Sequence, residues 1–149
     1  MAEATGLPIV HLDAYYWKSG WVASTPEEWS ATVAELASRD SWIMDGNYGG
    51  TMDQRFEACD AVVFLDVPRL TCIRRLILRR LRYRGGPRPE MVQGCPERLS
   101  LEFLLYVWHY PMNRRPGIMR RLQAMPPSKP YYVLKTPADA DNFIQGLRG

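Results

Sequence analysis

The sequence predicts an α/β fold in which helices cover both faces of an open parallel sheet. Short apolar runs at residues 42–44, 61–65 and 131–134 alternate with segments of helical periodicity. Because these runs do not alternate between apolar and polar residues, they are typical of strands buried on both faces of a parallel sheet.

Length and composition predict one domain over residues 1–149, with 46% hydrophobic residues available for a core. No apolar run approaches the roughly eighteen residues of a membrane span, and the first residues lack the features of a signal peptide. We therefore expect a cytoplasmic protein with no membrane partner. The three cysteines Cys59, Cys72 and Cys95 form no CxxC pair and are expected to be reduced thiols.

The first half of the chain divides at helix signals. Residues 1–6 resemble the last turn of a helix that ends at Gly6. A short strand at residues 9–12 then leads into an aromatic loop over residues 17–21. Thr25 is the predicted N-cap of a helix to about Arg39, because Pro26 and Glu28 complete the start signal. The predicted buried side of this helix consists of Trp29, Val33 and Leu36.

The second half continues the alternation. A strand at 42–44, a short helical or irregular piece at 52–58 and a strand at 61–65 precede a helix whose apolar residues recur at spacings of three and four. That apolar stripe, predicted to lie on the sheet, is Leu70, Ile73, Ile77 and Leu81. A helix over 97–110 is expected to end at Pro111 and to bury Leu101, Leu104, Leu105 and Trp108. A basic helix over 113–124, the strand at 131–134 and a helix from Thr136-Pro137 complete the chain.

Arginines are concentrated in residues 69–88, which carry eight positive charges and no acid, although the whole chain is only +3. Arg75, Arg79 and Arg82 recur at steps of four and three, so they share one helical face. Crowded guanidinium groups repel one another, and their planar donors match phosphate oxygens, so the pattern favours a phosphate-bearing ligand. A solvated basic face is the alternative.

Three carboxylates follow predicted strands, namely Asp13, Asp45 and Asp66. Ligands of open parallel sheets gather at the carboxyl ends of the strands. Acids beside arginines are the combination that Mg²⁺ and a transferred phosphoryl group require. His11 is expected to pack or cap at a strand end, and Tyr15, Tyr16, Trp17 and Trp21 to form either an acceptor pocket or an ordinary hydrophobic cover.

Six segments together resemble the bacterial DNA topology modulation proteins, a group similar to adenylate kinases among the P-loop kinases. They are VHLD at 10–13 with WKSGW at 17–21, WIMDGNYGG at 42–50, FLDVPR at 64–69, RLRYRG at 80–85 and GCPER at 94–98. The resemblance implies a three-layer nucleoside kinase-like fold with an arginine-rich lid at about 84–98. It also implies ATP- and Mg²⁺-dependent phosphoryl transfer to a nucleotide or another small-molecule acceptor.

The resemblance also implies roles for individual residues. Asp45 would orient the water shell of Mg²⁺, and Arg75 and Arg79 would grip the ATP phosphates during transfer. The further ATP-binding residues would be Asp66, Arg82, Arg114 and Arg115. The acceptor-binding residues would be Asp13, Asn47, Tyr48 and Arg55.

Two departures qualify these expectations. Gly49 stands where adenylate kinases have the arginine that binds the AMP phosphate, and Arg55 is a candidate substitute. The phosphate loop G-x-x-x-x-G-K-[ST] does not occur in the 149 residues. We expect its strand, loop and helix, about 20 to 25 residues, to precede Met1. A misplaced start, a shortened chain and natural loss are the alternatives.

That strand is the central one in the family, so its loss should leave two half sheets with exposed edges. We therefore predict that this chain binds ATP poorly and transfers phosphoryl groups slowly or not at all. Two other functions stay open. One is a non-catalytic nucleic-acid binder that uses the arginine helix, and the other is an inactive remnant that binds a protein partner through its sheet edges.

Overall fold

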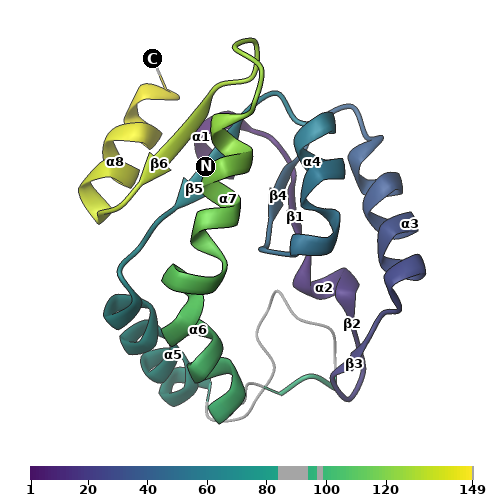
Figure 1. The fold of residues 1–149 in the computed structure, drawn as a ribbon, viewed down its shortest axis with the longest axis vertical. Coiled ribbons are helices and arrows are strands. Elements are labelled where there is room, and N and C mark those ends of the chain that lie inside the picture. Colours follow the sequence, from purple (N-terminus) through teal and green to yellow (C-terminus); the bar gives the residue numbers. More distant parts are fainter. Residues whose placement is uncertain (84–93, 97–98, 149) are drawn as a thin grey trace. The chain divides into compact units, whose positions relative to one another are not determined.

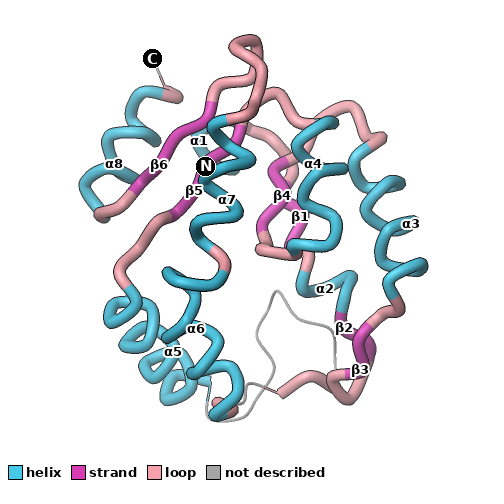
Figure 2. Tube along the Cα trace, in the orientation of Figure 1, coloured by secondary structure: helices cyan, strands magenta, loops and turns pink. Residues whose placement is uncertain are grey.

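The computed structural model describes residues 1–83, 94–96 and 99–148 and shows a mixed α/β protein (Figure 1). Short strands alternate with helices along the chain (Figure 2). The strands are β1 (Ile9–His11), β2 (Trp17–Lys18), β3 (Val22–Ala23), β4 (Ile43–Asp45), β5 (Val62–Leu65) and β6 (Tyr131–Leu134). The helices are α1 (Ala2–Thr5), α2 (Asp13–Tyr16), α3 (Pro26–Ala37), the 3₁₀ turn η1 (Gly49–Thr51), α4 (Met52–Ala58), α5 (Arg69–Tyr83), α6 (Leu101–Asn113), α7 (Arg115–Gln123) and α8 (Pro137–Gly146).

The described residues form two compact units. Unit 1 contains residues 1–59, 94–96 and 142–148, and unit 2 contains residues 60–83 and 99–141. Each unit holds one pair of parallel strands. The prediction that residues 1–149 form one domain stays a prediction. Of the predicted lid at 84–98, residues 84–93 and 97–98 lie outside the described residues.

The parallel sheet of unit 1 consists of β1 paired with β4, with Val10 opposite Met44 and His11 opposite Asp45 (Figure 1). Its hydrophobic core joins β1 to α3. The buried members of this core are Val10, Leu12, Trp29, Val33 and Leu36. The buried side of α3 is therefore the predicted one, because residues four and three apart lie on one side of a helix.

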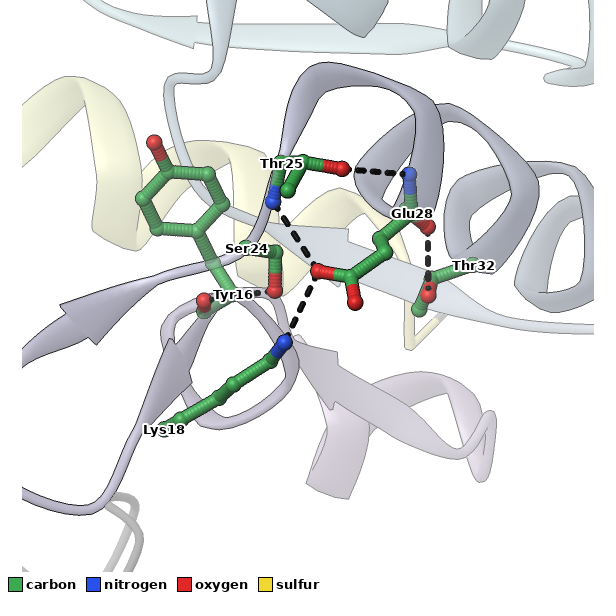
Figure 3. A network of polar contacts seen from close by, with 6 residues as sticks. All are labelled: Tyr16, Lys18, Ser24, Thr25, Glu28 and Thr32. Atoms are coloured by element: carbon green, nitrogen blue, oxygen red, sulfur yellow. Dashed lines mark hydrogen bonds and ion pairs between the residues drawn. The ribbon is translucent and has the colours of Figure 1, made fainter.

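Helix α3 begins with the predicted capping box. The Glu28 amide donates to Thr25 Oγ1 (3.2 Å), and the Thr25 amide donates to Glu28 Oε2 (3.0 Å). Lys18 Nζ donates to the same carboxylate (2.8 Å), in the network that Figure 3 shows. The hydrogen bond from Lys18, followed by the one from the Thr25 amide, lowers the pKa of Glu28. The predicted end of the first helix is also confirmed, because Gly6 caps α1 in the left-handed conformation at φ 72°.

The aromatic segment after α2 is a β-hairpin, so the prediction of a loop over residues 17–21 was wrong for Trp17 and Lys18, which form β2, and was confirmed for the turn at residues 19–21. Strands β2 and β3 pair antiparallel, with Trp17 opposite Ala23 and Lys18 opposite Val22. The turn between them uses Gly20 at φ 77° and Trp21 at φ 63°. The Trp21 indole donates to the Pro96 carbonyl (3.2 Å), which holds this side chain against the 94–96 segment.

The sheet of unit 2 consists of β5 paired in parallel with β6 over four residues, from Val62 opposite Tyr131 to Leu65 opposite Leu134. The bounds of β6 are those predicted from the sequence. Helix α5 packs against α6, and α6 continues towards α7. The buried residues of these helices are Leu76, Ile118 and Leu122.

The predicted buried face of α5 was wrong. Leu70, Ile77 and Leu81 are 67%, 44% and 62% exposed, and only Ile73 of the predicted stripe is half-buried. The buried residue is Leu76, which lies on the side where Arg79 and Arg80 are also half-buried. This is physically possible because an arginine can bury its aliphatic stem while its guanidinium reaches a polar partner.

Two expectations for α6 were also wrong. Pro111 does not end the helix, which runs to Asn113. A proline in the last turn removes only one late hydrogen bond, and the Arg114 amide still donates to the Tyr110 carbonyl (3.0 Å). Three of the residues predicted to face inward are exposed, namely Leu101, Leu105 and Trp108, and Leu104 is half-buried.

The coarse fold prediction is confirmed, because the chain is mixed α/β with parallel strand pairs. Within the described ranges, however, the parallel strands form two separate two-stranded sheets rather than one open sheet. Their division agrees with the expected half sheets, although its attribution to an absent central strand stays a prediction. No helix in the described part of the chain has both the length and the apolar composition needed to cross a membrane.

Candidate functional site

The carboxyl ends of β1 and β4 bring His11 and Asp45 together. These residues are register partners in the parallel pair, and His11 Nδ1 lies 3.2 Å from Asp45 Oδ2. The Asp45 side chain is 67% exposed, so one carboxylate oxygen contacts the imidazole while the group stays accessible to solvent. The sequence alone did not reveal this contact, which depends on the strand register.

Asp13 and Tyr48, both predicted to bind the acceptor, meet directly. The Tyr48 hydroxyl donates to Asp13 Oδ1. Burial, followed by this hydrogen bond, raises the pKa of Tyr48 far above its ordinary value, and a side-chain hydrogen bond with Trp17 opposes that rise. The phenol therefore stays protonated and orients the carboxylate. Asp13 occupies the first position of α2, two residues beyond the end of β1.

The loop from Gly46 to Thr51 presents Asn47 and Tyr48 after β4. Asn47 is exposed, whereas Tyr48 is half-buried. Gly46 has φ 149°, and a Cβ there would lie 2.9 Å from Leu12 Cβ. Glycine is therefore required here, both because its φ is positive and because a Cβ would clash with the buried Leu12 side chain.

The buried side chain of Arg55, which was also predicted to bind the acceptor, stabilises this loop through hydrogen bonds to its carbonyls. Arg55 is 8% exposed, and its guanidinium donates to the carbonyls of Thr51 (3.3 Å), Gly46 (2.9 Å) and Tyr48 (2.7 Å). Burial is the main cause that lowers the pKa of Arg55. Sequence reasoning missed this bracing role, although the spacing of four between Thr51 and Arg55 makes a contact along α4 possible. A direct contact between Arg55 and an acceptor stays a prediction.

Aromatic rings cover the same end of unit 1. The centroid of Tyr16 lies 4.6 Å from that of Tyr48, 5.0 Å from that of Trp17 and 5.1 Å from that of Trp29. The rings of Trp17 and Trp21 meet edge to face at 5.4 Å. Tyr16 and Tyr48 pack against the hydrophobic core, so part of this cluster is the ordinary cover that the sequence left as an alternative.

In unit 2 the structure joins two predicted ATP-binding residues, Asp66 and Arg115. Asp66 follows β5, and Arg115 begins α7. Arg115 Nε donates to both carboxylate oxygens (2.8 and 3.0 Å), and Nη2 donates to Oδ2 (2.8 Å). The pair raises the pKa of Arg115, and the Asp66 side chain is only 14% exposed. The interaction therefore anchors the start of α7 to the end of β5.

The remaining predicted residues of unit 2 are arginines on helices. Arg75 and Arg82 are exposed on α5, Arg79 is half-buried there, and Arg114 is exposed at the junction of α6 and α7. Arg69, which the resemblance did not single out, lies 4.1 Å above the centre of the Trp108 ring.

The end of β6 forms a second capped helix start. Asp139 Oδ2 accepts from the amides of Lys135 (2.8 Å) and Thr136 (2.9 Å), and the Asp139 amide donates to Thr136 Oγ1 (3.1 Å). The hydrogen bonds from the Lys135 and Thr136 amides to the carboxylate are the main causes that lower the pKa of Asp139. The strand-to-helix turn is thus held in one conformation.

The arrangement can be compared with the requirements of Mg²⁺. Mg²⁺ keeps several waters and usually takes only one or two protein carboxylates together with substrate phosphates. An exposed carboxylate such as Asp45 fits that mode. No group of three or more His, Cys, Asp or Glu side chains suited to a metal occurs in the part of the chain that the structure describes. Asp45 belongs to unit 1, and Arg75 and Arg79 belong to unit 2, so their assembly into one site stays a prediction.

Comparisons of the chain with protein-family models, with curated proteins and with solved structures find no match.

Proposed function

We propose that this chain is part of a kinase-like protein that transfers a phosphoryl group from ATP, with Mg²⁺, to a nucleotide or another small molecule. The observation that carries the proposal is the same in both units. Carboxylates lie at the carboxyl end of each parallel pair: Asp13 and Asp45 in unit 1, and Asp66 in unit 2. This is where open α/β sheets bind their ligands.

Under this proposal the two units have different tasks. Unit 1 binds the acceptor at Asp13 and Tyr48, in the loop that Arg55 braces, and Asp45 orients the metal's water shell. Unit 2 binds the ATP phosphates through Arg75 and Arg79, which stand one helical turn apart on α5. Guanidinium groups at this spacing can contact neighbouring phosphates and neutralise charge during transfer. Mg²⁺, when bound, supplies further charge neutralisation.

The 149 residues contain no G-x-x-x-x-G-K-[ST] loop, whose backbone amides and lysine ordinarily bind the β- and γ-phosphates. We therefore expect weak binding of ATP and little or no turnover by this chain. A turnover number within the usual range for kinases, about 1–100 per second, would contradict that expectation.

Weak binding can be tested without turnover. The chain is treated with an arginine-specific dicarbonyl reagent, with and without ATP and Mg²⁺, and modification is located by mass spectrometry. We expect Mg²⁺-ATP to protect Arg75 and Arg79 but not Arg39, an exposed arginine of unit 1. Asp45→Asn should remove the Mg²⁺ dependence of protection and leave the circular dichroism spectrum unchanged. Equal modification of all three arginines with and without nucleotide would refute the site.

One observation favours a second candidate, a nucleic-acid backbone binder. Arg74, Arg75 and Arg82 are all exposed on α5, and this helix contains no acid. Binding of a DNA duplex would weaken steeply with salt as counterions return to the phosphates. Loss of Mg²⁺-ATP protection together with tight, salt-dependent DNA binding would favour this second function over the kinase.

A further inference from the structure

Helix α5 exposes an apolar stripe that the proposed nucleotide site does not use. The exposed fractions are 67% for Leu70, 44% for Ile77, 52% for Leu78 and 62% for Leu81. Each residue turns an α-helix by about 100°, so Leu70, Ile77 and Leu81 lie within about 40° of one another. Four large apolar side chains on one helix are more than the scattered exposed leucine of an ordinary surface. We name this stripe, with Arg74, the α5 apolar face.

One arginine lies within the stripe and another lies beyond one of its edges. By the same rotation, Arg74 lies between Leu81 and Leu78, and Arg80 lies about 60° beyond Ile77. Arg74 is exposed, and Arg80 is half-buried. Arg75 and Arg79 lie about 110° and 150° from the middle of the stripe, so the proposed ATP contacts use a different side of α5.

This combination limits the chemistry of the partner. A nucleic-acid backbone would pair with the arginines but would leave the leucines in water. A neutral apolar surface would cover the leucines but would not pair with the arginines. The boundary between lipid headgroups and acyl chains meets both needs, because leucines enter the apolar layer while arginine side chains extend to lipid phosphates.

We propose that the α5 apolar face docks on a membrane surface rich in anionic phospholipid. The leucines enter the headgroup region, and Arg74 and Arg80 pair with phosphates. Such docking is peripheral, so it needs no spanning helix, and it differs from our expectation that the chain has no membrane partner. It does not depend on the kinase proposal, because the two sites use different sides of α5.

The test is cosedimentation of the 149-residue chain with vesicles of phosphatidylcholine alone or mixed equally with phosphatidylglycerol. We expect binding to the mixed vesicles that falls with salt, and binding at least about tenfold weaker to phosphatidylcholine. The variant Leu70→Ser/Ile77→Ser/Leu81→Ser should lose binding by about tenfold or more, since each leucine-sized side chain contributes substantially to apolar transfer. Because these residues are exposed, its circular dichroism spectrum should stay unchanged.

Helix α6 supplies the matched control. It exposes Leu101 and Leu105 at 71% and 48%, in the same unit, but contains no arginine or lysine. Leu101→Ser/Leu105→Ser should therefore bind mixed vesicles like the unchanged chain. Arg74→Gln alone should weaken binding and reduce its salt dependence.

Several results would overturn the proposal. They are equal binding to both kinds of vesicle, loss of binding in the α6 variant but not in the α5 variant, and sedimentation of the chain without vesicles that the α5 variant abolishes. The last result would assign the face to a second copy of the chain. DNA binding that depends on Arg74 but not on the leucines, without vesicle binding, would assign it to nucleic acid.

Discussion

Replacement of Arg55 by methionine tests how much the buried guanidinium contributes to the loop after β4. Methionine keeps much of the aliphatic volume but removes all five N–H donors. The Thr51 carbonyl loses its arginine partner in a buried position, whereas the Gly46 and Tyr48 carbonyls are partly accessible and can be hydrated.

The magnitude follows from these three contacts. A buried carbonyl without its partner costs about 1–3 kcal/mol. The two partly accessible hydrogen bonds should add about 0.5–1.5 kcal/mol each. Removal of a desolvated charge, whose burial already lowers the pKa of Arg55, offsets part of this loss. We expect Arg55→Met to lower the free energy of unfolding by about 2–4 kcal/mol.

Urea unfolding followed by tryptophan fluorescence measures this change. Four of the five tryptophans lie in unit 1, so the signal mainly reports the unit that contains the loop. Arg39→Met is the matched control, since Arg39 is exposed and its loss should change stability by less than about 0.5 kcal/mol. Arg55→Lys should recover only part of the loss, because an ammonium group cannot reach three carbonyls in the same fork. A stability for Arg55→Met equal to that of Arg39→Met would refute the bracing role.

Three further predictions concern other contacts. Asp66→Asn should lower the free energy of unfolding by about 1 kcal/mol, between the values for exposed and buried ion pairs, and should increase hydrogen exchange in α7. Urea unfolding measures the first effect and amide hydrogen exchange the second. Unchanged exchange in α7 would contradict the anchoring role of the Asp66–Arg115 pair. The hydrogen bonds that lower the pKa of Asp139 should stabilise the start of α8 at pH values above the ordinary pKa of 3.8, and this contribution should be lost as the pH falls through the lower pKa of the folded protein. NMR titration of the Asp139 carboxyl group checks this, and an ordinary pKa would argue against the cap. Gly46→Ala should cost more than about 2 kcal/mol through positive φ and a clash with a buried leucine, whereas Gly49→Ala, with no atom within 4 Å of its added Cβ, should cost far less in the same thermal unfolding experiment.

Much of the secondary structure could be predicted because its signals are local. The capping box of Thr25 and Glu28 lies within four residues, and Gly6 ends α1 by its own backbone conformation. The apolar run of β6 needed no distant partner to be recognised. Predictions failed where periodicity had two solutions. In α5, Leu70 and Leu76 are both apolar, and only contacts with the rest of unit 2 decide which of them is buried.

The residues of the candidate site could also be predicted from the sequence only in part. Carboxylates at strand ends, such as Asp45 and Asp66, could be placed from the sequence because strand boundaries show where the chain leaves the sheet. Their partners could not be placed. His11 meets Asp45 through the register of two strands, and Arg115 reaches Asp66 across 49 residues of sequence.

By itself the sequence determined the order of the longer helices and of the parallel strands, and the positions of the acids at the strand ends, since these depend on residues a few positions apart. The tertiary structure alone decided that the parallel strands form two pairs, that Arg55 braces a loop and that the apolar stripe of α5 faces outward. The physical reason is that burial and hydrogen-bond partners depend on groups far apart in the chain, and one local pattern is compatible with several such arrangements.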